Sequence, residues 1–237
     1  MLRDAISTPA GKAPYVRRLF STIADRYDLI TVLLSYGQDR RWKRRLIELA
    51  APVPGQHVLD LACGTGDLAF LAAGRGARVV GLDLTRRMIE LARAKRARAY
   101  GAAFLVGDMM ALPFADAQFD LVTTGYGLRN VPDIEVAMAE IRRVLRPGGR
   151  FYSLDFNRPA SRVVRSAYHT YLTAVGSTLG WLLHRDPDTY RYIPESIRTY
   201  PGADMVVERL RHHGFAKAEW RRVLGGLMAI HHATRGE

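Results

Sequence analysis

The chain has 237 residues, of which 48% are hydrophobic and 24% are charged. This length and composition predict one principal hydrophobic core. The single cysteine, Cys63, excludes an internal disulfide, and it excludes a thiolate metal cage or a radical iron–sulfur site built by this chain alone. A net charge of +12 favours anionic partners, without choosing between nucleic acid, acidic lipid and phosphorylated ligands.

Two segments bear on cellular location. Residues 1–14 are mixed and polar and contain no apolar signal-peptide segment, so we expect a flexible N-terminus and a cytoplasmic protein. The most apolar long stretch, residues 163–183, contains Arg165, His169 and two glycines. We therefore do not expect it to cross a bilayer.

The first predicted region is helical and covers residues 15–50, where apolar residues recur at three-to-four spacing. It forms a helical cap that ends before Pro52 and Pro54. In residues 56–156, short β-branched runs then alternate with helical segments. Strands are expected at 57–62, 77–83, 102–107, 119–124 and 150–156. This alternation predicts an α/β fold with a doubly wound, mainly parallel sheet.

Residues 160–213 are expected to be a helical insertion. It consists of a long helix after Pro159, an irregular segment over 186–201 and a helix ending near His213. Two final strands within residues 215–234 are joined by Gly225 and Gly226, and so short a join predicts an antiparallel hairpin. We expect residues 15–237 to form a single domain.

A glycine-rich turn follows the first predicted strand in the run DLACGTGD, residues 60–67. Gly64 and Gly66 allow a ligand to approach the backbone, although glycines here can also serve only to tighten the turn. Asp83 ends the second strand, where a carboxylate can accept both hydroxyls of a ribose. The competing interpretation is an N-cap for the next helix.

Asp108 and Met109 follow the third strand, just before the apolar run at 112–114, and together they could hold a purine. Ligands of open α/β sheets bind at these carboxyl ends, so three consecutive strand ends predict an adenosine site. Residues 64–69 also fit the permissive G-x-G-x-x-A dinucleotide pattern. Asp60 favours a cation such as a sulfonium over a pyrophosphate, which it would repel.

The sequence resembles the class I S-adenosylmethionine-dependent methyltransferases, and within them the quinone-biosynthesis C-methyltransferase family. The resemblance covers about residues 15–233, with Ala62 at a position where the wider pattern usually has Gly. It is carried by FSTIADRYD (20–28), VLDLACGTGDLA (58–69), GYGLRNVPD (125–133), RVLRPGGRFYSLDF (143–156), YRYIPESIRTYP (190–201) and GGLMAIHHA (225–233). It implies a seven-stranded Rossmann-like sheet in the order 3-2-1-4-5-7-6, with the last strand antiparallel.

The same resemblance implies the activity: methylation of demethylmenaquinol or, as the alternative, of 2-methoxy-6-polyprenyl-1,4-benzoquinol. S-adenosylmethionine is the implied cofactor, with Thr65 contacting it in the glycine loop and Gly125 lying beside its methionine moiety. The full predicted cofactor set is Asp60, Gly64, Thr65, Gly66, Asp83, Asp108, Met109 and Gly125.

Arg129 and Asn130 are the candidate catalytic residues, because the family motif places them at the reacting ring hydroxyl. Arginine stays protonated and is a poor base, so we expect Arg129 to stabilise a phenolate and Asn130 to orient the ring or the cofactor, while a proton leaves through water. The alternative is that Arg129 only ties its loop to the sheet.

Four further residues are candidates for the quinol pocket: Tyr126, Tyr190, Arg191 and Tyr192. Aromatic faces can stack on a planar ring, although such residues also serve for packing. The histidine pairs at 212–213 and 231–232 do not have the arrangement of a metal site, and no metal is expected.

A polyprenyl quinol substrate implies peripheral contact with the inner face of a membrane. The basic run at 40–45 and the helix expected at 162–185 are candidates, with a solvated face and a core or homodimer helix as the alternatives. We expect no nucleic acid partner, since the chain has no N/D-P-P-Y/F motif. An NAD-linked dehydrogenase, a nucleic-acid methyltransferase and a non-catalytic S-adenosylmethionine-binding protein remain as rival functions.

Overall fold

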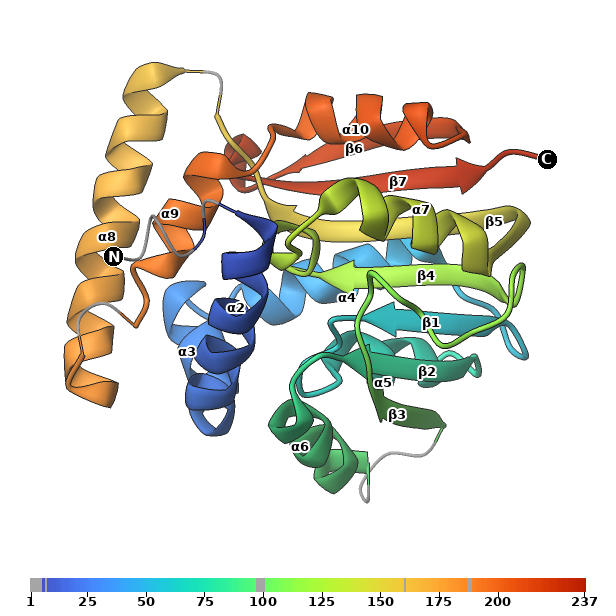
Figure 1. The fold of residues 1–237 in the computed structure, drawn as a ribbon, viewed down its shortest axis with the longest axis horizontal. Coiled ribbons are helices and arrows are strands. Elements are labelled where there is room, and N and C mark those ends of the chain that lie inside the picture. The colour runs from blue at the N-terminus through green and yellow to red at the C-terminus, as the bar shows by residue number, and fades with distance from the viewer. Residues whose placement is uncertain (1–5, 7, 97–100, 160, 187–188) are drawn as a thin grey trace.

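The computed structural model describes residues 6, 8–96, 101–159, 161–186 and 189–237. Seven strands form one sheet in the order β3-β2-β1-β4-β5-β7-β6, which confirms the expected order (Figure 1). The strands are β1 (His57–Leu61), β2 (Arg78–Asp83), β3 (Ala102–Val106), β4 (Phe119–Gly125), β5 (Leu145–Phe156), β6 (Phe215–Val223) and β7 (Met228–Arg235). Neighbours among β1 to β5 pair in parallel, and β7 is antiparallel to both β5 and β6.

Helices cover both faces of the sheet, which is why its central strands are nearly continuous hydrophobic runs. The covering helices are α4 (Asp39–Ala50), α5 (Asp67–Ala73), α6 (Arg86–Arg96), α7 (Ile134–Val144) and α10 (Ala203–His212). One buried cluster joins α7 and α10 to the strands, and a second joins α4, α5 and α6 to them. The sheet is therefore the middle layer of three.

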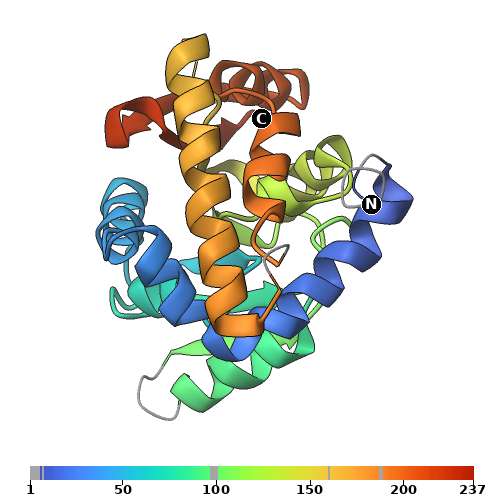
Figure 2. The same cartoon turned by 90° about the vertical axis from the view of Figure 1, so that its left-hand side faces the viewer.

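Four further helices gather at one end of the sheet: α2 (Pro9–Ile23), α3 (Tyr27–Leu34), α8 (Arg162–His184) and α9 (Tyr192–Thr199). In Figure 1 they lie on the side toward which the arrows of β1 and β4 point. Figure 2 shows the long helix α8 running across this end, with α9 beside it. A buried cluster around Ile23, Ile30 and Tyr190 joins the N-terminal helices to the insertion. We call these four helices the cap.

The N-terminal expectation needs a correction. Residues 9–14 were expected to be flexible, but α2 begins at Pro9. The Thr8 hydroxyl accepts a hydrogen bond from the backbone N–H of Gly11 at 3.2 Å, and Pro9 is the first helical residue. A hydroxyl N-cap followed by proline is a strong helix start, and it is a signal that apolar periodicity does not contain.

The insertion also differs from expectation. Residues 186–201 were expected to be irregular, but α9 occupies Tyr192–Thr199. Pro194 lies in its first turn, where the missing N–H costs no helical hydrogen bond. The long helix and the helix before His213 are confirmed as α8 and α10. Helix α6 is described as far as Arg96, and residues 97–100 lie outside the described residues.

Two strand boundaries differ from those expected. The fifth strand was expected to begin at residue 150, but β5 begins at Leu145 and includes residues 147–149, where the pairing with β4 skips from Leu145 to Arg150. The final hairpin is confirmed as antiparallel, with a join that spans residues 224–227. No helix in the described parts of the chain is long and apolar enough to cross a membrane.

Candidate active site

The loop after β1 is tightly folded. Ala62, Gly64 and Gly66 all have positive φ angles of +48°, +53° and +92°. A Cβ added at Gly66 would lie 2.8 Å from Phe70 and 2.9 Å from Phe104, so only glycine fits there. The loop can therefore pass directly into α5, which begins at Asp67.

Asp83 ties the glycine loop to the end of β2. Its carboxylate accepts hydrogen bonds from the backbone N–H groups of Gly64, at 2.9 Å, and Thr85, at 2.8 Å. The bond to Thr85 is the capping contact that was considered as an alternative, and the carboxylate also lines a pocket. Burial raises the pKa of Asp83 although both backbone donors lower it.

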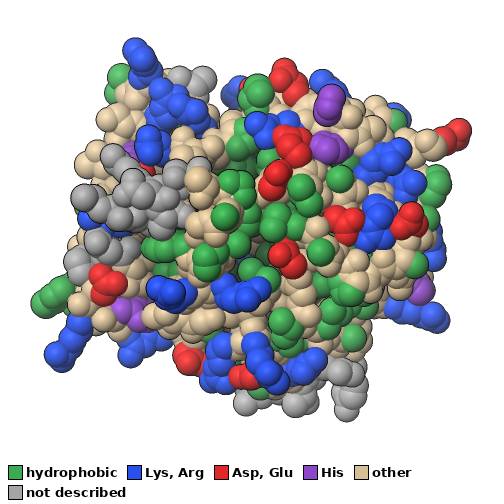
Figure 3. Space-filling view, in the orientation of Figure 1, with side chains coloured by type: hydrophobic (Ala, Val, Ile, Leu, Met, Phe, Trp, Pro, Cys, Tyr) green, Lys and Arg blue, Asp and Glu red, His purple; other side chains and the backbone are tan. Residues whose placement is uncertain are grey.

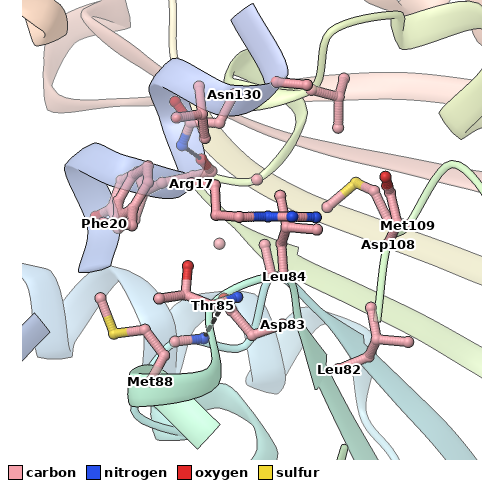
Figure 4. Close-up of a pocket in the computed structure, with 18 of the residues that line it drawn as sticks. Arg17, Phe20, Leu82, Asp83, Leu84, Thr85, Met88, Asp108, Met109 and Asn130 are labelled. Atoms are coloured by element: carbon pink, nitrogen blue, oxygen red, sulfur yellow. Dashed lines mark hydrogen bonds between the residues drawn. The ribbon is translucent and has the colours of Figure 1, made fainter. Parts of the chain in front are cut away.

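A pocket of about 100 Å³ lies at the ends of β1, β2 and β4, and we call it the strand-end pocket. Its wall includes five of the eight predicted cofactor residues: Gly64, Asp83, Asp108, Met109 and Gly125. Helix α2 closes the other side with Ala13, Val16, Arg17 and Phe20. Figure 4 shows Arg17 extending across the pocket toward Met109 and Asp108. In Figure 3, hydrophobic side chains gather around the hollow between α2 and the sheet.

The other three predicted residues do not line the strand-end pocket. Thr65 turns away from it, because its hydroxyl donates to Asp28 at 2.6 Å and accepts from Lys95 at 2.8 Å. Gly66 lies against Phe70 and Phe104 at the start of α5.

Asp60 is fully buried within β1, where its carboxyl accepts a hydrogen bond from the Thr123 hydroxyl at 2.8 Å. Burial raises the pKa of Asp60 to about 7. This carboxyl is therefore only partly ionised at neutral pH. It would repel a pyrophosphate less strongly than was expected from the sequence.

A second and larger space, of about 680 Å³, lies between the cap and the final hairpin, and we call it the apolar cavity. Its wall is mainly aliphatic and aromatic, with contributions from α2, α3, α8 and α9 and from the join between β6 and β7. The two spaces share four wall residues: Phe20, Tyr27, Tyr126 and Asn130. They therefore meet beside the loop that follows β4.

Arg129 lines the apolar cavity and is held on two sides. Its Nε lies 3.3 Å from Asp155, and its Nη1 donates to the Ser196 hydroxyl of α9. The Asp155 carboxylate also accepts the backbone N–H of Arg129 at 3.1 Å, and the guanidinium lies 5.0 Å from the centre of the Phe156 ring. Arg129 thus ties its loop to β5, as the alternative interpretation expected. The same side chain also faces the apolar cavity.

Asn130 is fixed at the junction of the two spaces. Its Nδ2 donates to the Tyr126 carbonyl at 2.7 Å, and its Oδ1 accepts from the Tyr192 hydroxyl at 3.0 Å. The structure thereby brings Tyr192 to Asn130, which is 62 positions away in the sequence. A side-chain amide held at both ends is a well-defined orienting group.

The remaining candidates for the quinol pocket lie in two different environments. Tyr190 and Tyr192 line the apolar cavity, whereas Arg191 is exposed and lines neither space. Sequence reasoning did not propose Arg17, Phe20 or Tyr27 as site residues, because they come from the cap and carry no strand-end signal. Among the described residues there is no group of three or more His, Cys, Asp or Glu side chains able to hold a metal ion.

Comparison with known proteins gives the family. The model of the ubiE/COQ5 methyltransferase family matches residues 9–235. The chain belongs to this family. It is therefore a methyltransferase that uses S-adenosylmethionine as its cofactor, and neither a dehydrogenase nor a metal enzyme needs to be invoked to explain the strand-end pocket.

Two relatives of the ubiE/COQ5 family illustrate the similarity. The ubiquinone/menaquinone biosynthesis C-methyltransferase UbiE of Paracoccus denitrificans is 42% identical over 226 residues, which cover 93% of this chain and 90% of that protein. The demethylmenaquinone methyltransferase of Thermus thermophilus is 41% identical and covers 92% of this chain and 100% of its own length. A solved SAM-dependent methyltransferase from Thermotoga maritima has a TM-score of 0.69 at 17% identity, covering 93% of this chain and 99% of its own, which shows the shared fold.

The residues of the strand-end pocket fit the cofactor of the ubiE/COQ5 family. Glycine is required at position 127, because a Cβ there would lie 2.2 Å from the Thr124 hydroxyl, whereas a Cβ at Gly125 would lie 3.1 Å from Leu68 and need only a small shift of that side chain. The carboxylate of Asp83 can accept ribose hydroxyls, and Asp108 with Met109 can hold the adenine. Within the described residues the Thr124 hydroxyl of β4 is buried without a hydrogen-bond partner.

Proposed function

We propose that this protein transfers a methyl group to a ring carbon of a lipid-tailed quinol. Demethylmenaquinol is the first candidate substrate, and 2-methoxy-6-polyprenyl-1,4-benzoquinol is the alternative. The observation that carries the proposal is that the apolar cavity meets the strand-end pocket at Tyr126 and Asn130. A planar ring at this junction would have the cofactor on one side and space for a hydrocarbon tail on the other. The names of the relatives agree with both substrates.

The cofactor supplies an activated methyl group, because a sulfonium is a good leaving group. The protein therefore has to align the ring and raise its electron density. Asn130, Tyr126 and Tyr192 form the positioning set, since the two hydrogen bonds of Asn130 fix it between the other two residues. Their aromatic rings provide flat faces for the quinol.

Arg129 stabilises the charge that develops on the ring oxygen when the hydroxyl loses its proton. Its exposed fraction is 5%, and in such a setting a cation acts more strongly on a nearby phenolate than it would in water. Asp155, which is fully buried, balances the charge of Arg129 while the cavity is empty of phenolate. The same ion pair sets the direction of the guanidinium.

The lipid tail leaves the apolar cavity through its exposed wall. Val163 and Tyr36 are 79% and 72% exposed, and both line the cavity together with Val164 and Leu224. Exposed basic residues stand beside this mouth, among them Arg162 at the start of α8. We infer peripheral contact of this mouth with an anionic membrane surface.

The basic run at 40–45 is less suited to membrane contact than the α8 mouth. Lys43 is buried and bonded to Asp39 and Asp67, so this charge faces the interior. Trp42 lines the apolar cavity, whereas the four arginines of the run are exposed and line neither space.

The decisive experiment follows labelled methyl groups from S-adenosylmethionine into lipid. Purified protein is incubated with reduced short-tailed demethylmenaquinone or, separately, with the methoxy-benzoquinol analogue, and the lipid is extracted. Label in one quinol establishes the reaction and identifies the ring. Tight cofactor binding with no label in either quinol would leave the fold and family intact and overturn the substrate proposal.

A further inference from the structure

A chain of buried polar side chains leads away from the junction of the two spaces. The Tyr126 hydroxyl donates to Oδ1 of Asp39 at 2.7 Å. Oδ2 of Asp39 lies 2.7 Å from Nζ of Lys43, which in turn lies 2.9 Å from Oδ2 of Asp67. Asp39 and Lys43 are 3% and 6% exposed. Burying charges in this way is costly, so their placement next to a cavity wall calls for a functional explanation.

The first member of this chain is held in an unusual backbone conformation. Tyr126 has a φ angle of +62°, in the left-handed region that a bulky residue rarely adopts. Its backbone N–H donates to the Leu154 carbonyl at 2.7 Å, and its carbonyl accepts from Asn130 at 2.7 Å. Such strain persists only where the surroundings enforce it, and it is concentrated at functional sites. The result is a phenol side chain that lines both spaces and reaches Asp39.

We propose that Asp39 is the proton acceptor for the methyl transfer and that Tyr126 carries the proton to it. This inference rests on the proposed function, because it requires a substrate with an acidic ring hydroxyl. It replaces the expectation that the proton leaves through water. It also assigns a function to Asp39, a residue of α4 that does not itself line either space.

The proton transfer balances as follows. The O–H bond of the quinol breaks, and its electron pair stays on the ring oxygen while the proton moves to Oη of Tyr126. The original hydroxyl proton of Tyr126 moves at the same time to Oδ1 of Asp39. Once the ring carbon carries the methyl group, that carbon releases its own proton to water, and Asp39 returns the stored proton through Tyr126 to the ring oxygen. Both side chains regain their starting states, and one proton is released overall.

The surrounding charges suit these two roles. Burial, and after it the neighbouring charges of Asp39, Tyr27 and Asp155, raises the pKa of Tyr126 well above its usual value, so the phenol stays protonated and acts as a carrier. Burial lowers the pKa of Lys43, but the charges of Asp67, Tyr27 and Asp39 outweigh it and raise the pKa overall. Lys43 therefore stays positive beside the Asp39 carboxylate.

Tyr126 and Arg129 both lie beside the ring of Phe156, on one wall of the apolar cavity. The Phe156 ring lies 5.7 Å from the Tyr126 ring, measured between centroids, and 5.0 Å below the Arg129 guanidinium. A quinol oxygen in front of Phe156 would have the proton carrier on one side and the stabilising cation on the other. Deprotonation and charge stabilisation would then act on the same oxygen.

Tyr126→Phe is the principal test, because it removes one oxygen and leaves the ring in place. We expect kcat at pH 7 to fall by about 100-fold, a typical contribution of general base catalysis. The loss should shrink as the pH approaches the pKa of the quinol itself. It should also be small for a ring-halogenated quinol, whose more acidic hydroxyl ionises without help. The Kd for S-adenosylmethionine, measured by calorimetry, should stay within about 2-fold of wild type.

The matched control is Tyr200→Phe, which also removes a buried phenol oxygen, one that has no partner among the described residues and lines neither space. It should keep the wild-type kcat and pH profile. Asp39→Asn is the second variant, since it keeps the shape of the acceptor but removes its basicity, and it should reproduce the pH and substrate dependence of Tyr126→Phe. Its thermal unfolding is measured in parallel.

Two outcomes would overturn the inference. One is a Tyr126→Phe protein with the wild-type kcat and pH profile, and the other is an equal loss with both quinols at every pH, which is the signature of a structural role. Failure of the proposed function would look different. In that case the wild-type protein itself would put no label into any quinol.

Discussion

The two ends of the candidate site are built in different ways. The strand-end pocket takes most of its polar wall from turns that directly follow parallel strands, in residues 64–127, whereas the apolar cavity takes its wall from cap helices and a hairpin join in residues 19–42, 163–193 and 224–228. The pocket has backbone N–H groups and carboxylates, and the cavity has aliphatic and aromatic side chains. A charged cofactor suits the first and a hydrocarbon tail suits the second.

This difference implies that separate substitutions can weaken cofactor binding at one end and substrate binding at the other. Hydrogen bonds to charged groups determine affinity in the strand-end pocket, and excluded volume with hydrophobic contact determines it in the apolar cavity. Only four junction residues line both spaces: Phe20, Tyr27, Tyr126 and Asn130. The following predictions test that separation.

The largest expected effect is in the strand-end pocket. Asp83→Ala removes the carboxylate proposed to hold the ribose and also frees the N–H groups of Gly64 and Thr85. We expect the Kd for S-adenosylmethionine to rise by about 100-fold or more, since each hydrogen bond to a charged group is worth roughly 1.5–3 kcal/mol. Calorimetry measures it. Asp116→Ala is the control, because that carboxylate is 76% exposed and lies outside both spaces. An unchanged Kd in Asp83→Ala would remove the ribose assignment.

A smaller effect is expected in the apolar cavity. Ala167→Trp adds a large ring to a wall residue of α8. We expect KM for a long-tailed quinol to rise by about 10-fold, with a smaller change for a short-tailed one and none in the Kd for the cofactor. Steady-state kinetics with both tails provide the measurement. Ala174→Trp is the matched control on the exposed side of the same helix. Equal effects of the two variants would mean that the cavity does not hold the tail.

The smallest effect is expected at the cavity mouth. Val163→Glu places a negative charge on a residue that is 79% exposed, so binding to anionic vesicles should weaken by about 5-fold in flotation assays. Activity on a detergent-soluble short-tailed quinol should not change. Val136→Glu, on α7 and 43% exposed, adds the same charge away from the mouth. If wild-type protein shows no preference for anionic over neutral vesicles, peripheral membrane contact is wrong, and a concentration-dependent mass would then assign α8 to a homodimer.

Some residues could be placed from sequence alone, and their positions show why. Asp83 and Asp108 each follow a strand whose hydrophobic run is visible in the sequence, and parallel strands bring their ends together whatever else the chain does. Thr65 was expected at the same place, but its side chain points to Asp28 of α3 and Lys95 of α6. Its direction depends on a neighbour from α3, which no local pattern encodes.

The catalytic wall was predicted in part. The motif GYGLRN drew attention to Tyr126, Arg129 and Asn130, which line the apolar cavity, but not to their partners. Asp39 directly precedes the basic run at 40–45 and was not a candidate, and Ser196 fell in a segment expected to be irregular. A side chain's hydrogen-bond partner is a property of the packed chain, because residues 87 and 67 positions apart meet only after α4 and α9 have packed against the end of the sheet.

By itself, the sequence determined the order of the elements, the strand-end location of the cofactor site and the family, because hydrophobic periodicity, turn glycines and short motifs are local properties. Only the tertiary structure decided the rest. It showed that α2 begins at Pro9, that the cap encloses an apolar cavity, and that Asp39 lies behind Tyr126. These features depend on how separate helices pack against the ends of one sheet, and packing among distant segments has no fixed spacing in the sequence.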